Sequence, residues 1–252
     1  MTTVRDILDF FEGFAPAATA MDFDNVGLLV GSSDAAVTKA LLALDITAEV
    51  AEEAAANGCG LIVSHHPVIF QPMKRLSARS VPYLLASHGI AAVCMHTSLD
   101  LSGSFGVNTC LADALGVQQL RKSADGECLF VGELAADTDM RTFAERTKAA
   151  LDAAGLRFTA VRQTVRTVAV SSGAGGSEIF AAAREGADVL VTGEIKHHEI
   201  NAANELGVNI IDAGHFASEN VVMAPLQKKL AQAFPNVAFS LSKSYSDGVN
   251  YL

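Results

Sequence analysis

The chain has 252 residues, of which 50% are hydrophobic and 18% charged, a composition that excludes intrinsic disorder and fits one large domain or two closely packed lobes. Its 28 acidic residues against 18 Lys and Arg give a formal charge of −10, so we expect no nucleic-acid partner, because such a surface repels phosphate. No apolar run reaches the about 18 residues of a membrane span, and Asp6, Asp9 and Glu12 interrupt the start of the chain, where a signal peptide is apolar, so we expect a cytoplasmic protein.

Short apolar runs alternate with helical patterns along most of the chain. Apolar residues close to the 3.6-residue period predict a first helix over 4–14. Strands are then expected at 27–30, 40–44, 61–63 and 90–95, with helices at 48–56 and 81–87. They are followed by a strand at 128–134, a helix at 140–154 and strands at 158–161 and 167–170. Strands separated by helices of this length predict an α/β fold with mostly parallel mixed sheets flanked by helices.

An internal repeat indicates how these elements are organised. Each half of the chain has two adjacent histidines after one predicted strand, and a histidine four residues before a carboxylate after the next. The first half has His65-His66 and His96 with Asp100; the second has His197-His198 and His215 with Glu219. Four matches in the same order indicate a duplication, so we expect two pseudo-symmetric α/β lobes, residues 1–120 and 121–252, packed as one unit.

The repeated motifs contain the donors of a metal site. Six of the seven histidines lie in these motifs or beside them at predicted strand ends, where α/β sheets bind ligands. Imidazoles and carboxylates without thiolates suit Zn, Fe, Mn, Co or Ni. Neighbouring residues such as His65 and His66 point in different directions, so one ion rarely binds both, whereas two ions about 3.5–4 Å apart can. The alternatives are a histidine pair satisfied by backbone groups and, for Asp100, a helix N-cap.

The motifs resemble the signatures of the Nif-three-like family, whose members are also called GTP cyclohydrolase 1 type 2 homologues. The matching stretches are Phe23–Gly31, Ser64–Phe70, His96–Asp100, Thr192–Glu199 and Asp212–Glu219. The chain resembles the compact form of the family, which lacks a central insertion. The resemblance implies two intertwined lobes, a toroidal homohexamer and two divalent metal ions per subunit. The implied ligands are His65, His66, Asp100, His215 and Glu219, with Glu219 bridging the ions.

The resemblance also implies a function. It indicates a metal-dependent hydrolase of the GTP cyclohydrolase type, in which a metal-activated water opens the ring of a purine nucleotide. The alternatives are a metal-handling or metal-sensing protein without turnover, and a scaffold ring with structural metals. We expect four further residues to have catalytic or pocket roles beside the metals, although they could equally form polar clusters that open helices. These residues are His96, Glu194, His197 and His198.

Overall fold

The computed structural model describes all 252 residues and separates into two compact units. Unit 1 contains residues 1–102 and 223–246, and unit 2 contains residues 103–222 and 247–252. The chain therefore leaves unit 1, forms most of unit 2, returns to unit 1 and ends in unit 2. This grouping differs from the segments 1–120 and 121–252, because a late helix and strand belong with the first hundred residues. The division into two duplicated copies stays a prediction.

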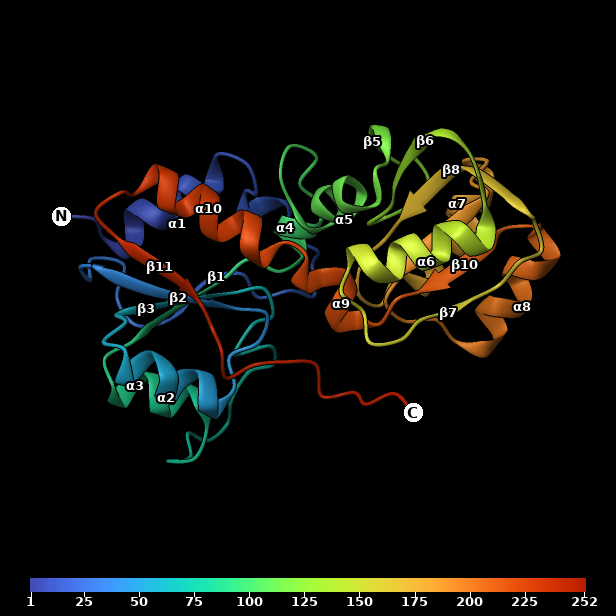
Figure 1. The fold of residues 1–252 in the computed structure, drawn as a ribbon. Coiled ribbons are helices and arrows are strands. Elements are labelled where there is room, and N and C mark those ends of the chain that lie inside the picture. Colours follow the sequence, from blue (N-terminus) through green and yellow to red (C-terminus); the bar gives the residue numbers. More distant parts are fainter. The chain divides into compact units, whose positions relative to one another are not determined.

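Unit 1 is built around a five-stranded mixed sheet in the order β1-β4-β3-β2-β11. Its strands are β1 Gly27–Val30, β2 Lys39–Ala43, β3 Leu61–Ser64, β4 Ala91–Cys94 and β11 Ala238–Leu241. All neighbours are parallel except β1, which runs antiparallel to β4. The helices are α1 Val4–Glu12, η1 Ala17–Thr19, α2 Ala48–Ala56, α3 Val81–Ser87, α4 Thr97–Asp100 and α10 Met223–Ala233. In Figure 1, α2 and α3 lie on one face of this sheet and α1 and α10 on the other.

The βαβ connections of unit 1 explain where its polar residues gather. Helix α2 begins after Thr47, whose hydroxyl accepts a hydrogen bond from the Val50 amide (3.3 Å), and it buries Val50, Ala51 and Ala54. These side chains pack in one apolar cluster with Ile62 of β3. Such crossovers keep β2, β3 and β4 parallel, so the residues that follow the three strands meet at one edge of the sheet.

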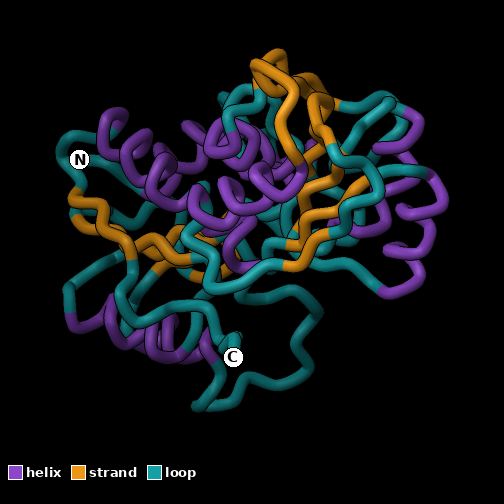
Figure 2. The backbone as a smooth tube through the Cα atoms, turned by 45° about the vertical axis from the view of Figure 1, so that its right-hand side comes forward, coloured by secondary structure: helices purple, strands orange, loops and turns teal.

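Unit 2 is built around a six-stranded mixed sheet in the order β5-β6-β8-β9-β10-β7. Its strands are β5 Gln118–Lys122, β6 Phe130–Asp139, β7 Arg157–Phe158, β8 Thr164–Val170, β9 Val189–Thr192 and β10 Asn209–Asp212. The helices are α5 Val107–Leu115, α6 Met140–Ala150, η2 Gly175–Glu178, α7 Ile179–Arg184, α8 His197–Leu206 and α9 His215–Asn220. Figure 2 shows helices flanking the strands within each unit. The predicted α/β class with two mixed, helix-flanked sheets is therefore confirmed.

Parallel pairing in unit 2 is confined to the centre of its sheet. Strands β8, β9 and β10 are parallel, whereas β5, β6 and β7 pair antiparallel with their neighbours. The expected strand at 158–161 is only the two-residue β7. None of the helices in either unit combines the length and apolarity needed to cross a membrane.

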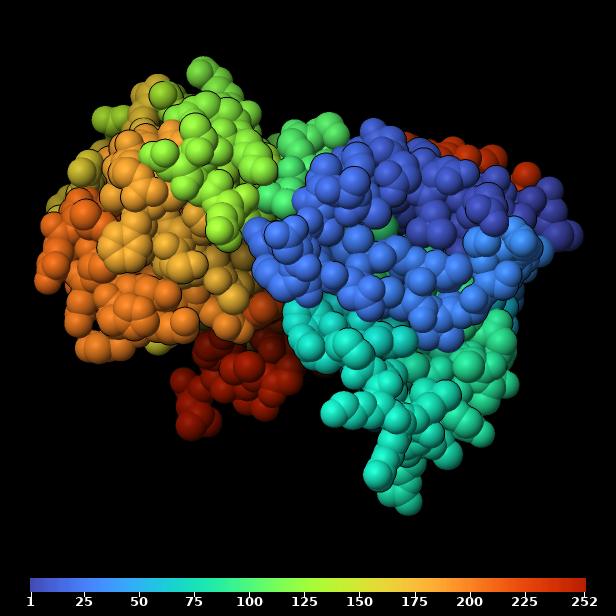
Figure 3. Space-filling model, turned by 180° about the vertical axis from the view of Figure 1, so that it is seen from behind, coloured from blue at the N-terminus to red at the C-terminus, as the bar shows by residue number.

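A long loop of unit 1 connects β3 to α3. Residues 70–79 of this loop are exposed, and the space-filling view shows this part of the chain projecting from unit 1 (Figure 3). The loop directly follows His65 and His66, so it continues from the strand end that carries the histidine pair. Exposed loops held by a rigid sheet often contribute to binding sites.

Glu185, at the end of α7, fixes the polar turn that follows β5. Its carboxylate accepts hydrogen bonds from Arg121 (2.6 Å), the Ser123 hydroxyl (2.6 Å) and the Ala124 amide (3.0 Å). These contacts, that of Arg121 foremost, lower the pKa of Glu185 to about 2. A glutamate with a lowered folded-state pKa stabilises the fold above its unfolded pKa of about 4.3 and loses this effect as the pH falls.

We therefore expect the replacement Glu185→Gln to destabilise unit 2 in a pH-dependent way. The difference in free energy of unfolding from the wild type should be constant above about pH 5 and shrink as the pH falls toward 2. Urea unfolding at a series of pH values measures this difference. Glu205→Gln, at an exposed position of α8, is the control. A difference that does not change with pH would contradict the assignment.

Candidate metal centre

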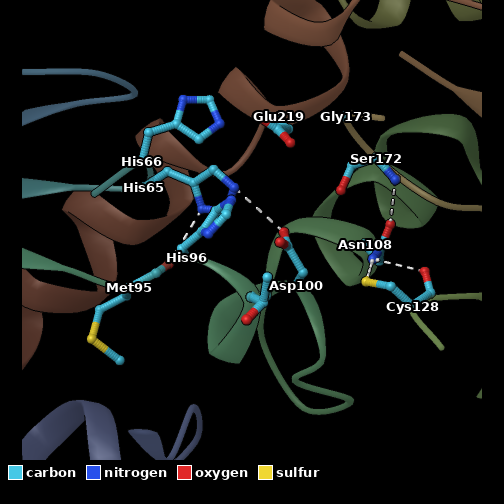
Figure 4. A network of polar contacts seen from close by, with 12 residues as sticks. His65, His66, Met95, His96, Asp100, Asn108, Cys128, Ser172, Gly173 and Glu219 are labelled. Carbon is cyan, nitrogen blue, oxygen red and sulfur yellow. Dashed lines mark hydrogen bonds and ion pairs between the residues drawn. The ribbon is translucent and has the colours of Figure 1, made fainter. Parts of the chain in front are cut away.

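Three histidines of unit 1 lie together at the ends of β3 and β4. His65 directly follows Ser64, the last residue of β3, and His96 stands two residues after β4. The ring centroids of His65 and His66 are 5.0 Å apart, and that of His96 is 5.2 Å from His65 and 5.5 Å from His66. One donor nitrogen from each ring lies within 4.8 Å of the other two (Figure 4). The geometry thus brings together three imidazoles that could hold a metal ion.

Acceptors within unit 1 hold the histidine pair in position. The Nδ1 atom of His65 donates to the Met95 carbonyl (3.2 Å), and that of His66 contacts Oδ1 of Asp45 (2.9 Å). The other carboxylate oxygen of Asp45 accepts a hydrogen bond from the Tyr245 hydroxyl. Carbonyl and carboxylate partners of this kind fix the ring orientation of metal-binding histidines.

Asp24 is the acceptor that orients the ring of His96. Its Oδ1 lies 2.8 Å from His96 Nδ1, and its Oδ2 accepts hydrogen bonds from the Thr97 amide (2.9 Å) and hydroxyl (2.5 Å). Burial opposes the negative charge of Asp24, but these hydrogen bonds outweigh it and hold the pKa of its carboxyl well below the usual range. Asp24 is therefore an ionised acceptor inside unit 1.

Asp100 supplies a carboxylate to the same cluster. It is the buried last residue of α4, and its Oδ1 lies 3.5 Å from His65 Nε2 (Figure 4). The residue that precedes the first turn of α4 is His96, so the alternative of Asp100 as an N-cap is wrong.

Unit 2 has its own pair of possible metal donors at the start of α9. His215 opens this helix, and its Nε2 lies 3.0 Å from Oε2 of Glu219, one helical turn later. The Nδ1 of His215 contacts Glu194 (2.8 Å). The contact with Glu219 raises the pKa of His215 to about 9 against the effect of burial, and Glu194 adds to this rise. Two carboxylates around one imidazole form an electronegative site that suits a cation.

A glycine loop packs directly against this pair. Gly173 follows β8 with a φ of +59°, its amide donates to the Ser218 hydroxyl (3.0 Å), and its carbonyl accepts from the Gly193 amide (2.9 Å). A Cβ atom on Gly173 would lie 2.0 Å from Oε1 of Glu219. Only glycine therefore allows this close approach.

Hydrogen bonds within unit 2 also anchor this glycine loop through Ser172, the residue before Gly173. The Ser172 amide donates to Oδ1 of Asn108 (2.8 Å), and the Asn108 amide group contacts the Cys128 sulfur (3.3 Å), as Figure 4 shows. Asn108 is fully buried on α5, so the loop that contacts Glu219 is anchored to the core of the unit.

A cavity of about 540 Å³ opens beside His215 within unit 2. It lies at the carboxyl ends of β8, β9 and β10, the usual ligand position in parallel α/β sheets. Its wall includes the cations Arg157 and Lys196 and the aromatic rings Phe216 and Tyr251. The wall also carries four carboxylates, those of Glu194, Glu199, Asp212 and Asp247. Asp212 pairs with Arg157, so the cavity offers charges of both signs and apolar faces next to His215.

Within each unit the structure brings predicted residues together. His65, His66, His96 and Asp100 lie together in unit 1. His215, Glu219 and Glu194 lie together in unit 2. His197 and His198 are exposed at the first turn of α8 and do not line the cavity, and their roles stay a prediction.

Sequence reasoning missed three residues that orient the histidines: Asp24, Asp45 and Tyr245. Asp45 had a usable signal, because it directly follows the predicted strand 40–44, as His65 follows its own strand. Tyr245 had no such signal in the sequence, since 200 positions separate it from Asp45.

The donors in both units are imidazole nitrogens and carboxylate oxygens, a chemistry that fits zinc and the neighbouring divalent transition metals.

Comparisons with known proteins support the fold described above. A family model described as Duf34/NIF3 (NGG1p interacting factor 3) matches residues 2–248. A Clostridium perfringens protein named GTP cyclohydrolase 1 type 2 homolog is 31% identical, and the alignment covers 99% of both chains. The crystal structure of a Staphylococcus aureus hypothetical protein superposes with a TM-score of 0.91 at 28% identity, over 99% of each chain. A Bacillus cereus protein related to NIF3 has the same fold, with a TM-score of 0.91 at 24% identity, over 100% of this chain and 99% of that one.

Proposed function

The chain belongs to the Duf34/NIF3 family, and from this premise we propose that it is a metal-dependent hydrolase acting on a small molecule. Two divalent ions per subunit would be held by His65, His66, Asp100, His215 and Glu219. The single observation that carries the proposal is the way the imidazoles are held: the Nδ1 atoms of His65, His66 and His215 each contact an oxygen acceptor. This arrangement leaves Nε2 as the nitrogen for a metal.

The residues around the ligands support a catalytic use of such a centre. Bound divalent ions supply Lewis acidity and a water whose pKa is lowered toward 7. Glu194 orients His215 by its contact with Nδ1. In the cavity, Arg157 is paired with Asp212, so Lys196 is the cation that would attract an anionic group of the substrate. Phe216 and Tyr251 would pack against a ring.

We propose a purine nucleotide as the first substrate to test. The name GTP cyclohydrolase 1 type 2 homolog is carried by relatives that align with most of this chain. A nucleotide combines the two features for which the cavity has partners, an anionic phosphate chain and a flat heterocycle. The toroidal homohexamer is part of the same proposal, and light scattering after size-exclusion chromatography tests it.

The test is hydrolytic release of formate from GTP by protein loaded with Zn, Mn, Fe, Co or Ni. We expect at least one metal to support release, and His66→Ala to lower the rate by at least about 1,000-fold, because a catalytic ion supplies several kcal/mol and each 1.36 kcal/mol is tenfold. His88→Ala, which removes a histidine at the end of α3, should leave the rate unchanged. No release with any metal would contradict the hydrolase and favour a metal-handling role.

A further inference from the structure

The last residues of the chain form one wall of the cavity beside His215. Residues 247–252, here called the tail segment, belong to unit 2, although the residues directly before them belong to unit 1. Three residues of the tail segment, Asp247, Val249 and Tyr251, line the cavity. The segment has no helix or strand, and Val249 and Tyr251 are 59% and 46% exposed. Apolar and aromatic side chains that stay accessible in the wall of a cavity are available to pack against a ligand.

Two glycines determine where the ring of Tyr251 lies. A Cβ atom on Gly155, in the loop between α6 and β7, would lie 2.4 Å from Cδ1 of Tyr251 and 2.9 Å from its Cγ. The ring therefore packs directly on the backbone of Gly155, and any side chain at that position would displace it. A Cβ atom on Gly214 would lie 3.4 Å from the Tyr251 hydroxyl oxygen, so the ring reaches the residue that precedes His215.

Among the four carboxylates of the wall, Asp247 is the one best able to receive a ligand. Glu194 and Asp212 pair with His215 and Arg157, and Glu199 is buried and accepts a hydrogen bond from the Lys196 amide (2.7 Å). The hydrogen bond of Asp247 stays within the tail segment, where its Oδ1 accepts from the Val249 amide (3.0 Å). An ionised carboxylate only accepts hydrogen bonds, so Asp247 favours a ligand with N–H groups at its edge.

We infer that the tail segment recognises the ring of the ligand, with Tyr251 packed against its face and Asp247 accepting hydrogen bonds from its edge. The ligand class is a planar nitrogen heterocycle with adjacent N–H donors, joined to an anionic group for which Lys196 is the cation. Among purine nucleotides this selects guanine, whose N1–H and N2 amino groups point the same way, over adenine, whose N1 presents a lone pair. The inference rests on the cavity as the substrate site of the proposed function, but neither on bound metal nor on hydrolysis.

The experiment measures nucleotide binding to the full chain by isothermal titration calorimetry. The probes are guanosine monophosphate (GMP) and adenosine monophosphate (AMP), and the chain is kept free of metal so that neither is turned over. We expect the wild type to bind GMP at least about fivefold more tightly than AMP, the lower end of what paired hydrogen bonds to a base contribute. Asp247→Asn should remove most of this preference, because an amide can turn its NH₂ group toward N1 of adenine.

Two glycine variants test the position of Tyr251. Gly155→Ala should displace the ring and weaken GMP binding at least about fivefold, as Tyr251→Ala should, because this is the lower end of what stacking of a base on an aromatic ring contributes. Tyr251→Phe keeps the ring and should keep the affinity. Gly248→Ala is the matched control within the tail segment, since its Cβ would meet no atom within 4 Å, and it should bind GMP like the wild type.

The outcomes separate this inference from the proposed function. Equal affinity of the wild type for GMP and AMP, unchanged GMP affinity in Gly155→Ala and Tyr251→Ala, or no binding of either nucleotide overturns the inference. Release of formate from GTP by the metal-loaded wild type would leave the proposed function standing in each of these cases, and its absence together with absent binding overturns both. Gly155 lies outside the left-handed region, so alanine there adds no backbone strain, and circular dichroism checks that the variant folds.

Discussion

Replacing Gly173 by alanine should abolish the metal binding that we propose for His215 and Glu219, while unit 2 keeps its fold. The new Cβ would lie 2.0 Å from Oε1 of Glu219 and 3.2 Å from Nε2 of His215. The carboxylate is the end of a flexible side chain, so it can swing away at little cost to folding, but it then leaves the position of a ligand. We expect metal content after dialysis to fall below two ions per chain, measured by elemental analysis.

Gly186→Ala is the matched control for this variant. Gly186 also has a positive φ, +76°, but a Cβ there would meet no atom within 4 Å. Both substitutions therefore place alanine in the left-handed region, at a cost of about 1–2 kcal/mol in free energy of unfolding. Only Gly173→Ala should lose metal. Wild-type metal content in Gly173→Ala, or equal loss in Gly186→Ala, would show that the close approach of this loop to Glu219 does not matter for binding.

The inner strands were predictable because burial on both faces makes them short apolar runs. The expected strands at 40–44 and 61–63 agree with β2 and β3 to within a residue, and all residues of β3 are buried. The edge strand β5 escaped prediction because four of its five residues are exposed, which gives it a polar sequence resembling a linker. Its pairing with β6 depends on tertiary contact and not on local pattern.

In the candidate site, too, some residues were predictable from the sequence and others were not. His65 and His215 were recognisable because imidazoles that follow buried strands stand out against an apolar background. The acceptors that orient them were harder to find, because their partners come together only in the folded sheet. Tyr245 reaches Asp45 because β11 pairs in parallel with β2, from almost opposite ends of the sequence. No spacing rule in the sequence expresses that pairing.

Asp24→Ala should destabilise unit 1 by about 2–4 kcal/mol, because it leaves buried donors without an acceptor. The two carboxylate oxygens of Asp24 receive four contacts. Oδ2 accepts from the Thr97 amide and hydroxyl, and Oδ1 is contacted by the Asn25 amide (2.7 Å) and His96 Nδ1. The Asp24 side chain has no exposed area, so water cannot replace it. Urea unfolding of the metal-free protein measures the loss.

Asp24→Asn distinguishes the carboxylate from a polar group of the same shape. An amide has one acceptor oxygen, so either the Thr97 side or the Asn25 and His96 side of Asp24 loses its acceptor. We therefore expect a loss of about 1–2 kcal/mol, between those of Asp24→Ala and the exposed control Asp22→Ala, which should stay within about 0.5 kcal/mol of the wild type. Equal stability of Asp24→Asn and the wild type would mean that one oxygen satisfies the site. The fold would then not need the charged carboxylate of Asp24 beside His96.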